Sequence, residues 1–420
     1  MNTKRLTDFI GRNGLKSTAY AAAQHLSDMR VDREYDRMMK ERVPDWAELS
    51  RQRHKRFAYE PLISVIVPTY RPVEEHFRRM LRSLREQTYA NYEILLGNGG
   101  GISDNSNAAL SQAKGDHIAL LDQDDILEPD ALYHVVERIN EGARLIYTDE
   151  DKYDTESGRY LRAFRKKDFD MELLLSNNYV CHFLTIQREL VEKAGGFRSE
   201  YDGAQDHDLI IRCAEHIDPG ETAHIKRVLY HWRIHELSTA GDPAKKGYAH
   251  LAGKRAIEDH LARCHKRGEV IETEHRGFYR VEYEAAEDMS GFELHLARNL
   301  KSLSRDNSER MASYLAANDD VGAVSGRVID RLGRIVYSGY GTDENGRKEA
   351  LYHGMDHNMP GEFNIASLRQ EVPVISPRCM MIRSSLSDCI DPDPFRMSEN
   401  IRNRGYRIIM DPKMLYLKVR

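Results

Sequence analysis

The stretch "HIALLDQDDILEPDAL", residues 117–132, decides how this chain folds. Its first five residues form a short, mostly apolar run, which predicts a buried strand. That strand passes directly into Asp122, Asp124 and Asp125. Carboxylates at the mouth of a buried strand repel one another and are costly to withdraw from water. The chain therefore needs a reason to gather them there.

Strands and helices alternate on both sides of this stretch. Alternating elements predict an α/β fold with a mostly parallel, Rossmann-like sheet, whose ligands bind beyond the carboxyl ends of the strands. Pro68, the glycine-rich turn 97–101, Asp122–Asp125 and Asp149–Asp151 all fall at that edge. The expected strands are 63–67, 92–96, 117–121 and 145–147, and the expected helices are 77–84, one that Ser103 caps, and one with Pro129 in its first turn.

Composition bounds the class of protein. A chain of 420 residues predicts two or more domains, and 40% hydrophobic with 31% charged residues is typical of a soluble globular protein. The net charge of −5 gives no general case for a nucleic-acid partner. The five cysteines include no C-x-x-C pair, which argues against a disulfide framework or zinc knuckle and fits a reducing cytoplasm. No run approaches the roughly 20 apolar residues of a membrane helix.

The N-terminal segment, residues 1–60, is expected to be helix and connector. It is rich in charge, and Leu6, Phe9, Ile10 and Leu15 are its early apolar points. A basic amphipathic helix could lie on anionic lipid at the inner face of the membrane. We prefer a helix docked on its own protein, because the apolar stripe is thin.

The acidic strand end also predicts a metal site. Carboxylate oxygens are the ligands that Mg²⁺ or Mn²⁺ prefers, and such an ion neutralises both the carboxylates and a diphosphate. Asp124 is the candidate ligand, and Asp122 contacts either the metal or a ribose. The alternative is a solvated acidic loop, because a D-x-D spacing alone is a weak signal.

Several motifs occur with this turn in a fixed order. They are "PLISVIVPTYRP" (61–72), "LLDQDDILEPDAL" (120–132), "IYTDEDKYD" (146–154), "GGFRSEYDGAQDHDLIIRCAE" (195–215) and "VLYHWRIHELSTA" (228–240). Over about residues 60–260 the chain resembles the family 2 glycosyltransferases of the GT-A fold, specifically bacterial, rhamnosyltransferase-like enzymes of surface-polysaccharide synthesis. The resemblance implies an inverting transfer of a sugar from a nucleotide-sugar donor, such as a UDP- or dTDP-sugar, to a glycan or lipid-linked acceptor.

The resemblance assigns a general base and a third metal ligand. Asp206 matches the aspartate that serves as base, although Gln205 replaces the first acid of the family's dyad, and Asp208 is a second candidate. A helix N-cap role for Asp206 is compatible with catalysis. His235, in an Arg-x-His pattern, would complete the metal site. Its i, i+4 spacing from His231 suits zinc ligands on a helix, but the preceding residues predict a strand, so we disfavour zinc.

Other residues are expected to contact the donor or the acceptor. Arg233 would pair with the diphosphate, because guanidinium matches phosphate geometry; the alternative is a surface salt bridge. Asp149 and Glu150 would face the donor or acceptor sugar, or form an ordinary charged loop. The expected nucleotide-sugar contacts are Pro68, Thr69, Tyr70, Asn107, Asp122 and Arg233.

Two departures weaken the match. Only residues 97–100 separate Leu96 from Gly101, where family members carry a longer segment that helps to read the nucleoside. Residues 271–420 look like the later half of a second copy of the module. Phe395–Glu399 stands where its base should be, so this part is read as a packing module, an acceptor-binding module or a fragment.

These observations predict three parts and two possible functions. Residues 1–60 form the N-terminal helical segment, 61–270 the glycosyltransferase domain and 271–420 a degenerate, partial second domain. The preferred function is a metal-dependent, inverting sugar transfer in cell-surface polysaccharide synthesis, in the cytoplasm or peripherally at the membrane. The alternative is a catalytically silent nucleotide-sugar-binding or scaffold protein of a polysaccharide assembly.

Overall fold

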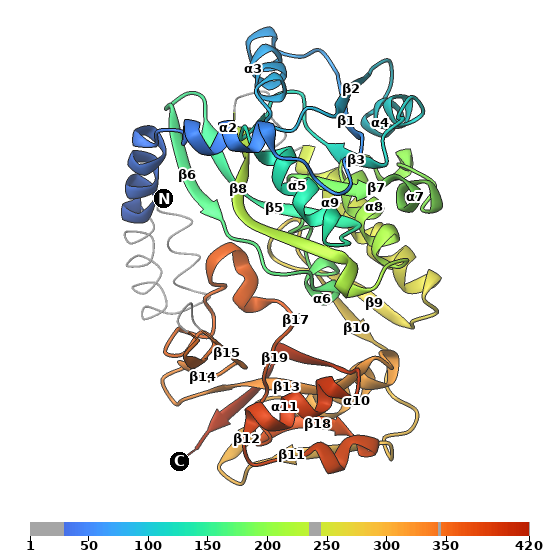
Figure 1. Ribbon diagram of the computed structural model, residues 1–420. Helices are drawn as coiled ribbons and strands as arrows, with labels where there is room; N and C mark the ends of the chain where they lie inside the picture. Colours follow the sequence, from blue (N-terminus) through green and yellow to red (C-terminus); the bar gives the residue numbers. More distant parts are fainter. Residues whose placement is uncertain (1–28, 235–244, 343–345, 420) are drawn as a thin grey trace.

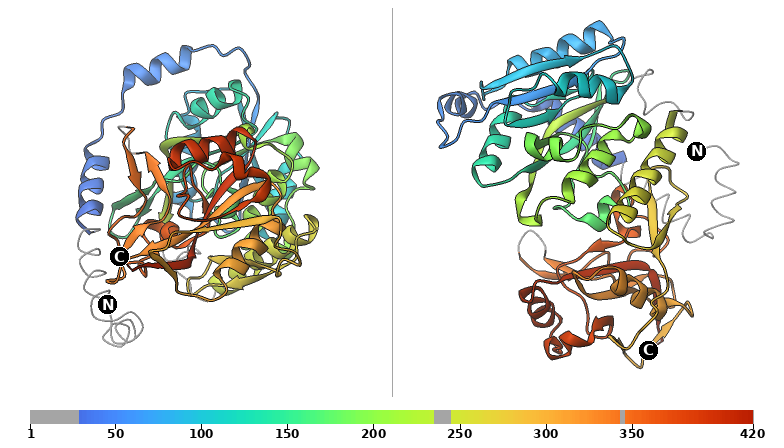
Figure 2. Two further views of the ribbon diagram at one scale, coloured as in Figure 1. Left: turned by 90° about the horizontal axis from the view of Figure 1, so that it is seen from below. Right: turned by 90° about the vertical axis from the view of Figure 1, so that its right-hand side faces the viewer.

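The structure, a computed structural model, describes residues 29–234, 245–342 and 346–419. They form two lobes, an upper one drawn from blue to yellow-green and a lower one in orange and red (Figure 1). The side view in Figure 2 shows the same division. No helix among these residues is long and apolar enough to cross a membrane.

The upper lobe is built on a twisted sheet with helices on both faces. Strand β1 pairs in parallel with β2 and β3, and β5 pairs in parallel with β8. The antiparallel strand β7 joins the two parallel groups, because it lies between β3 and β5. In order across the sheet the strands are β2 Tyr92–Gly97, β1 Ile63–Pro68, β3 His117–Leu120, β7 Leu184–Gln187, β5 Leu145–Asp154, β8 Thr222–Ile234 and β4 Ile126–Leu127, with β6 Arg159–Phe164 paired to β5.

Alternation of apolar side chains along the strands builds a core on each face. Val65 and Val67 of β1 belong to a cluster that includes residues of α3 and α5, whereas Ile66 belongs to a cluster that includes residues of α8 and α9. Both faces are therefore buried, as a mostly apolar strand requires. The helices are α2 Trp46–His54, α3 Glu74–Arg85, α4 Ile102–Leu110, α5 Ala131–Asn140, α6 Met171–Leu174, α7 Arg188–Lys193, α8 Gln205–Ala214 and α9 Lys245–Arg263, with short turns η1 Ser199–Tyr201 and η2 Pro219–Glu221.

Three local predictions were wrong. Strand β5 does not end at residue 147: it continues to Asp154, so the second acidic cluster lies within a strand that β6 and β8 flank. Gly101, not Ser103, precedes helix α4, and the Ser103 hydroxyl instead donates to the carbonyl of Arg198. Pro129 lies just before α5 rather than in its first turn.

The described part of the N-terminal segment docks on the protein itself. Residues 29–41 are helical. The Tyr35 hydroxyl donates to Asp151 at 2.7 Å, and Arg42 pairs with Glu128 at 2.6 Å. Leu6, Phe9, Ile10 and Leu15 lie outside the described residues, so the membrane-surface prediction is untouched by these contacts.

The lower lobe has its own sheet and core. Hairpin β9 Gly268–Glu272 and β10 Tyr279–Tyr283 leads into it. Its strands, in order, are β11 Phe292–Leu296, β18 Cys379–Arg383, β13 Val321–Ile329, β19 Arg407–Lys418 and β12 Leu300–Ser302, with β14 Ile335–Tyr337 on β13, β17 Gln370–Glu371 on β19, and a separate hairpin, β15 Tyr340–Thr342 and β16 Lys348–Ala350. Helices α10 Asn307–Ala317 and α11 Pro394–Asn403 pack on it, with turns η3 Glu362–Ser367 and η4 Ser384–Cys389.

Strand pairing in the lower lobe repeats that of the upper lobe. Strand β13 pairs antiparallel with its hairpin partner β14, antiparallel with β18 and parallel with β19, as β5 pairs with β6, β7 and β8. The parallel pair shifts register before Asp149 in one lobe and before Arg327 in the other. The α/β fold with a second, partial unit is thus confirmed, and Arg327 occupies the place of Asp149.

Side-chain hydrogen bonds join the lobes. Asp170 caps α6 through Oδ1, which accepts from the amides of Glu172 and Leu173, while its Oδ2 accepts from the amide of Glu371 in β17 at 2.7 Å. Lys167 donates to the side chain of Gln370. The expected domain boundary after residue 270 falls inside β9, so we propose instead that it follows β10.

Candidate functional site

The first acidic turn splits into a buried and an accessible part. Asp125 is 1% exposed: its Oδ1 accepts from the backbone amide of Arg233 at 2.7 Å, and its Oδ2 accepts from the Tyr230 hydroxyl. Burial, with the charges of Asp122 and Asp124, raises its pKa well above the ordinary value. Asp125 therefore fixes the turn to β8.

Asp122 and Asp124 remain at the mouth of the strand. The Asp122 side chain is 47% exposed. Withdrawal from bulk water in the cleft raises its pKa to about 6, and the carboxylates of Asp124 and Asp206 act in the same direction. Gln123, between the two acids, exchanges hydrogen bonds with the backbone N–H and C=O of Tyr70. Gln123 thus holds the turn to the end of β1, and the carboxylates of Asp122 and Asp124 repel each other.

Sequence reasoning missed His182. Its Nε2 lies 4.0 Å from Asp122 Oδ2, its ring stacks on Tyr230 with centroids 5.1 Å apart, and its backbone N–H donates to Glu150. Burial opposes protonation, but Glu150 and Asp122 raise the pKa of His182 to about 9. The imidazolium offsets part of the acidic charge. No motif marks this residue, because it lies in the connection before β7, distant in sequence from its partners.

The two acids of β5 take different positions. Glu150 lines a cavity and pairs with the buried Lys166 at 3.1 Å. Burial works to raise its pKa, yet Lys166 and His182 hold it at about 2. Asp149 is 1% exposed and bonds to Arg165, to the amide of Lys166 and to His224. Asp149 is therefore a buried carboxylate with three bonding partners, and its contact with a sugar stays a prediction.

Asp206 and Asp208 lie at the start of α8 but point to different partners. Asp206 Oδ2 accepts from Asn178 at 3.0 Å and from the Cys181 thiol at 2.7 Å. Asp208 is fully buried between Arg198 and Arg212, each of which donates two hydrogen bonds to it. The structure thus leaves Asp206 at a surface that a ligand can reach and occupies Asp208 completely.

Two cavities meet at Asp206. One, of about 300 Å³, extends toward Pro68 and Asp122. The other, of about 540 Å³, extends toward Trp232 and the lower lobe. Both volumes fall in the range of small-molecule sites, about 300–1,000 Å³. Asp206, Cys181, His182, Gly203 and Ala249 border both. We call the cavity of about 300 Å³ the acidic cavity and the cavity of about 540 Å³ the aromatic cavity.

Arg233 is buried without an acceptor. The residue is 1% exposed, and within the described chain none of its three guanidinium nitrogens has a hydrogen-bond partner. Burial lowers its pKa, while Asp125 and Asp124 act to raise it. A buried guanidinium without hydrogen bonds is costly. The burial of Arg233 contradicts a surface salt bridge, and its guanidinium nitrogens, free within the described residues, could bind an anion. Strand β8 carries it, which also agrees with the strand predicted around His231; His235 lies outside the described residues.

Of the remaining residues expected to contact the donor, one lines a cavity and the others are engaged in hydrogen bonds or exposed. Pro68 lines the acidic cavity. Thr69 bonds to the carbonyl of Gly97 through both its amide and its hydroxyl, and Tyr70 is 64% exposed. Asn107 uses its side-chain amide to bind the N–H and C=O of Phe197, so the structure shows a clamp between α4 and the following loop there.

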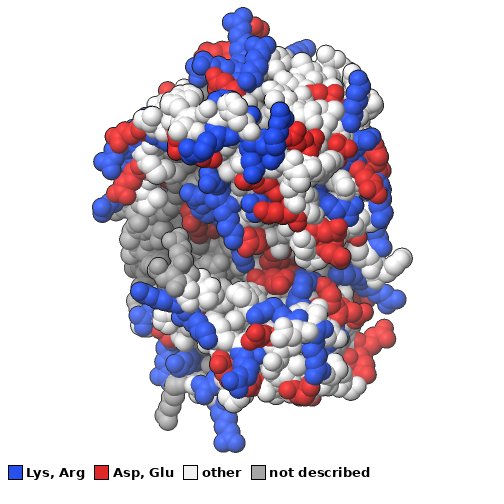
Figure 3. Space-filling view, in the orientation of Figure 1, with Lys and Arg blue, Asp and Glu red and all other residues white. Residues whose placement is uncertain are grey.

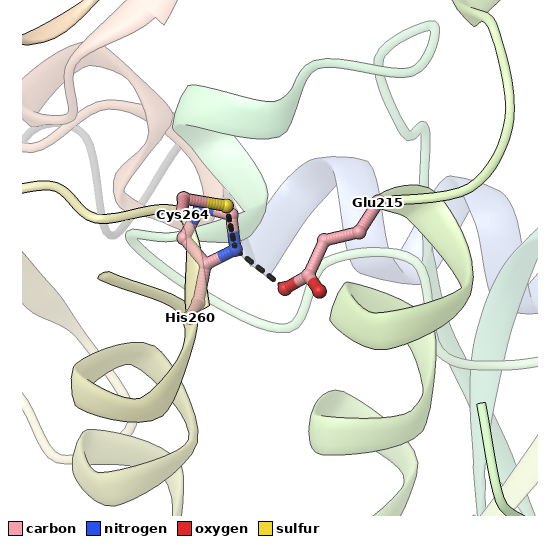
Figure 4. Close-up of side chains that lie close together, drawn as sticks. All are labelled: Glu215, His260 and Cys264. Atoms are coloured by element: carbon pink, nitrogen blue, oxygen red, sulfur yellow. Dashed lines mark hydrogen bonds and ion pairs between the residues drawn. The ribbon is translucent and has the colours of Figure 1, made fainter. Parts of the chain in front are cut away.

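Helix α8 is also fixed at its carboxyl end. Glu215 accepts from His260 at 2.7 Å, and the Cys264 sulfur lies 3.7 Å from the same imidazole nitrogen (Figure 4). Zinc accepts glutamate, histidine and cysteine. However, Arg263 donates to both oxygens of Glu215. We therefore assign this cluster to the packing of α8 on α9, which in turn positions Asp206.

Charge on the face seen in Figure 3 is mixed, with lysine and arginine interspersed among aspartate and glutamate. This agrees with the net charge of −5.

Known proteins match a part of the chain that includes several residues of this site. Residues 96–195 match the family described as "Glycosyl transferase family 2". The uncharacterized protein y4gI of Sinorhizobium fredii is 39% identical over 50% of this chain and 26% of its own length, and the O-antigen biosynthesis protein RfbC of Myxococcus xanthus is 32% identical over 51% and 19%. TarS of S. aureus, solved in complex with UDP-GlcNAc, is 18% identical over 47% of this chain and 66% of its own, with a TM-score of 0.39.

The match therefore spans about a quarter or less of the two curated relatives. The family match, residues 96–195, contains the acidic turn, both acids of β5 and His182, and it begins at the end of β2, after which the chain has only a short glycine-rich turn. In this segment the chain is similar to glycosyl transferase family 2 and to an O-antigen biosynthesis protein.

Proposed function

We propose that the chain transfers a sugar from a nucleotide-sugar donor to a glycan or lipid-linked acceptor, with inversion, in the synthesis of a bacterial surface polysaccharide. The observation that carries the proposal is the position of Asp206, where the acidic and aromatic cavities meet. A direct displacement needs a donor on one side of the base and an acceptor on the other. RfbC, an O-antigen biosynthesis protein, supports the assignment to polysaccharide synthesis.

The acidic cavity suits the donor and a divalent cation. Asp122 and Asp124 offer carboxylate oxygens, and the pKa of Asp122 is raised by burial and further by neighbouring carboxylates, whose charge a cation would offset. Mn²⁺ or Mg²⁺ bound there would stabilise the charge of the leaving diphosphate. Arg233 is proposed to pair with a diphosphate oxygen, since its guanidinium lacks an acceptor in the described chain.

Asp206 is proposed to take the proton of the acceptor hydroxyl. Asn178 and Cys181 donate to one carboxylate oxygen and the amide of His207 to the other, so the carboxylate is oriented before any ligand arrives. The imidazolium of His182 lies beside Asp122 and Glu150 and favours an anionic ligand there. Both effects lower the reorganisation needed at the moment of transfer.

The test is turnover by the full chain with a panel of UDP-, dTDP- and GDP-sugars, with and without Mn²⁺. Asp206→Asn should reduce release of nucleoside diphosphate by about 10²–10⁴, the usual share of general-base catalysis, while the Kd for the donor stays within a few-fold. Glu75→Gln, an exposed site on α3 that removes the same charge, is the control. Loss of donor affinity with unchanged turnover would assign Asp206 to binding.

A silent, nucleotide-sugar-binding scaffold is the second candidate. The short connection between β2 and α4 favours it, because that part of the fold is expected to hold the nucleoside. Saturable binding of a nucleoside diphosphate with Mn²⁺, stabilising the fold by about 2.7 kcal/mol at 100 times its Kd, without turnover of any donor, would select it.

A further inference from the structure

The aromatic cavity has walls from both lobes. The upper lobe supplies Phe164 and Trp232, hairpin β9–β10 and its turn supply Phe278, and the lower lobe supplies Phe363 and Asn364. The turn η3, which carries the last two, rises from the lower lobe toward the upper one just before β17 (Figure 1). A cavity that opens onto Asp206 is therefore completed by the part of the chain that lacks a base of its own.

The two lobes meet here through a pair of rings. The centroids of Phe164 and Phe363 are 4.0 Å apart, with 33° between their planes. Phe363 is only half-buried, so it keeps surface toward the cavity it lines. A half-buried aromatic ring beside polar groups is typical of a binding wall rather than of a core.

The turn is held in place rather than loosely attached. Phe363 and Asn364 have φ of 49° and 63°, a left-handed conformation that residues with a side chain adopt at a cost of about 1–3 kcal/mol. Ser367 donates to the carbonyl of Asn364, and Gln370 donates to that of Ile365. Lys167 of the upper lobe then binds Gln370 at 2.6 Å. The backbone that presents Phe363 is thus fixed against both lobes.

A polar group is available beside the aromatic wall. Asn178 lines the aromatic cavity, and its amide nitrogen donates to Asp206. Its buried Oδ1 has no hydrogen-bond partner among the described residues. A buried acceptor without a donor is costly, and a ligand hydroxyl would supply one. Next to the proposed base, the cavity thus offers an aromatic face and an oxygen that accepts.

We propose that turn η3 of the lower lobe forms the specificity wall for the acceptor and that the acceptor end bound there is a sugar ring, packed on Phe363 with a hydroxyl toward Asn178. A pyranose has an apolar C–H face and polar edges, which is the combination that this cavity accommodates. The degenerate unit thereby selects the substrate of its neighbour. This inference rests on the proposed function, because Asp206 defines which cavity takes the acceptor.

The experiment measures transfer by the full chain to p-nitrophenyl glycosides of glucose, galactose, mannose, rhamnose and N-acetylglucosamine. Phe363→Ala should raise the KM for the preferred glycoside by about tenfold or more, as the loss of a central aromatic contact does, while the KM for the donor moves less than twofold. Phe363→Tyr, which keeps the ring, should restore the acceptor KM. Phe395→Ala is the matched control, since this half-buried phenylalanine of the same lobe contacts Tyr340 and lies on α11.

Equal acceptor KM values for Phe363→Ala and Phe395→Ala, both folded by circular dichroism, would overturn the wall. An equal rise in donor and acceptor KM would do the same, because it reports a general disturbance. If the wild type turns over no donor, the proposed function fails, and binding of the same glycosides by saturation-transfer NMR decides the wall separately. Binding that Phe363→Ala abolishes and Phe395→Ala retains supports it, and the absence of any binding rejects it.

Discussion

Replacing Asp208 by asparagine should lower the free energy of unfolding, whereas Asp206→Asn should lower turnover. The Asp208 carboxylate is fully buried and accepts four hydrogen bonds, two each from Arg198 and Arg212. Removing one partner from a buried ion pair costs about 3–5 kcal/mol, and asparagine keeps one acceptor, so we expect about 3 kcal/mol. With m near 3 kcal/mol/M, the urea midpoint of the chain should fall by about 1 M.

The stability difference between wild type and Asp208→Asn should depend on pH. Burial works to raise the pKa of Asp208, but the hydrogen bonds from Arg198 and Arg212 lower it below its ordinary value. The charged form therefore stabilises the fold above the pKa of the unfolded state, and that contribution is lost as the pH falls through the folded pKa. The stabilities of wild type and Asp208→Asn should converge in acid.

Urea titrations followed by far-UV circular dichroism at pH 7 and pH 4 test this reasoning. Glu75→Gln, which removes an exposed charge 69% accessible to solvent, should change stability by less than about 0.5 kcal/mol. A midpoint for Asp208→Asn that matches this control, or a loss of turnover without a loss of stability, would show that Asp208 does not act as a structural charge.

Three further predictions concern the metal, a buried histidine and the lower lobe. Asp124→Ala should abolish Mn²⁺-dependent binding of a nucleoside diphosphate in calorimetry and leave the melting temperature intact; unchanged binding would refute the metal assignment. His231 is buried, and although burial itself lowers its pKa, the hydrogen bonds that its ring donates to Asp151 and Glu128 raise it to about 9. Its contribution should be complete below pH 6.5 and disappear as the pH rises through 9. His231→Gln should therefore be least stable relative to wild type near pH 6, and parallel stability curves from pH 6 to 10 would contradict this. Glu399→Gln should leave turnover unchanged in the same donor assay, and a loss in the Asp206→Asn background would reveal a second active site.

Periodicity was sufficient for the strands and helices that make up the upper sheet. Short apolar runs at 63–67 and 117–121 became β1 and β3, because each is buried on both faces and offers no alternative element. The prediction failed at β5, where Asp149–Asp151 looked like a loop. Acids tolerate a strand interior there because His224, Lys166 and His231 neutralise them, and those partners come from distant segments.

The candidate site shows the same limit. The acidic turn and the pair Asp206 and Asp208, two residues apart, could be read from the sequence, since each motif is local. Which aspartate is accessible could not, because Arg198 and Arg212 decide it. His182 and Phe363 reach the site from connections without periodicity: the fold of the upper lobe brings His182 to it, and the packing of the two lobes brings Phe363.

Asp170 ties the thermodynamics of the lobes together. One of its oxygens closes the first turn of α6, and the other closes the end of β17 across the boundary. Melting of the lower lobe takes the Glu371 amide away from Asp170 Oδ2, and melting of the upper lobe takes the carboxylate away from that amide. The chain should absorb heat as one cooperative unit, and a cut after β10 would yield two weakened fragments instead of two autonomous folds.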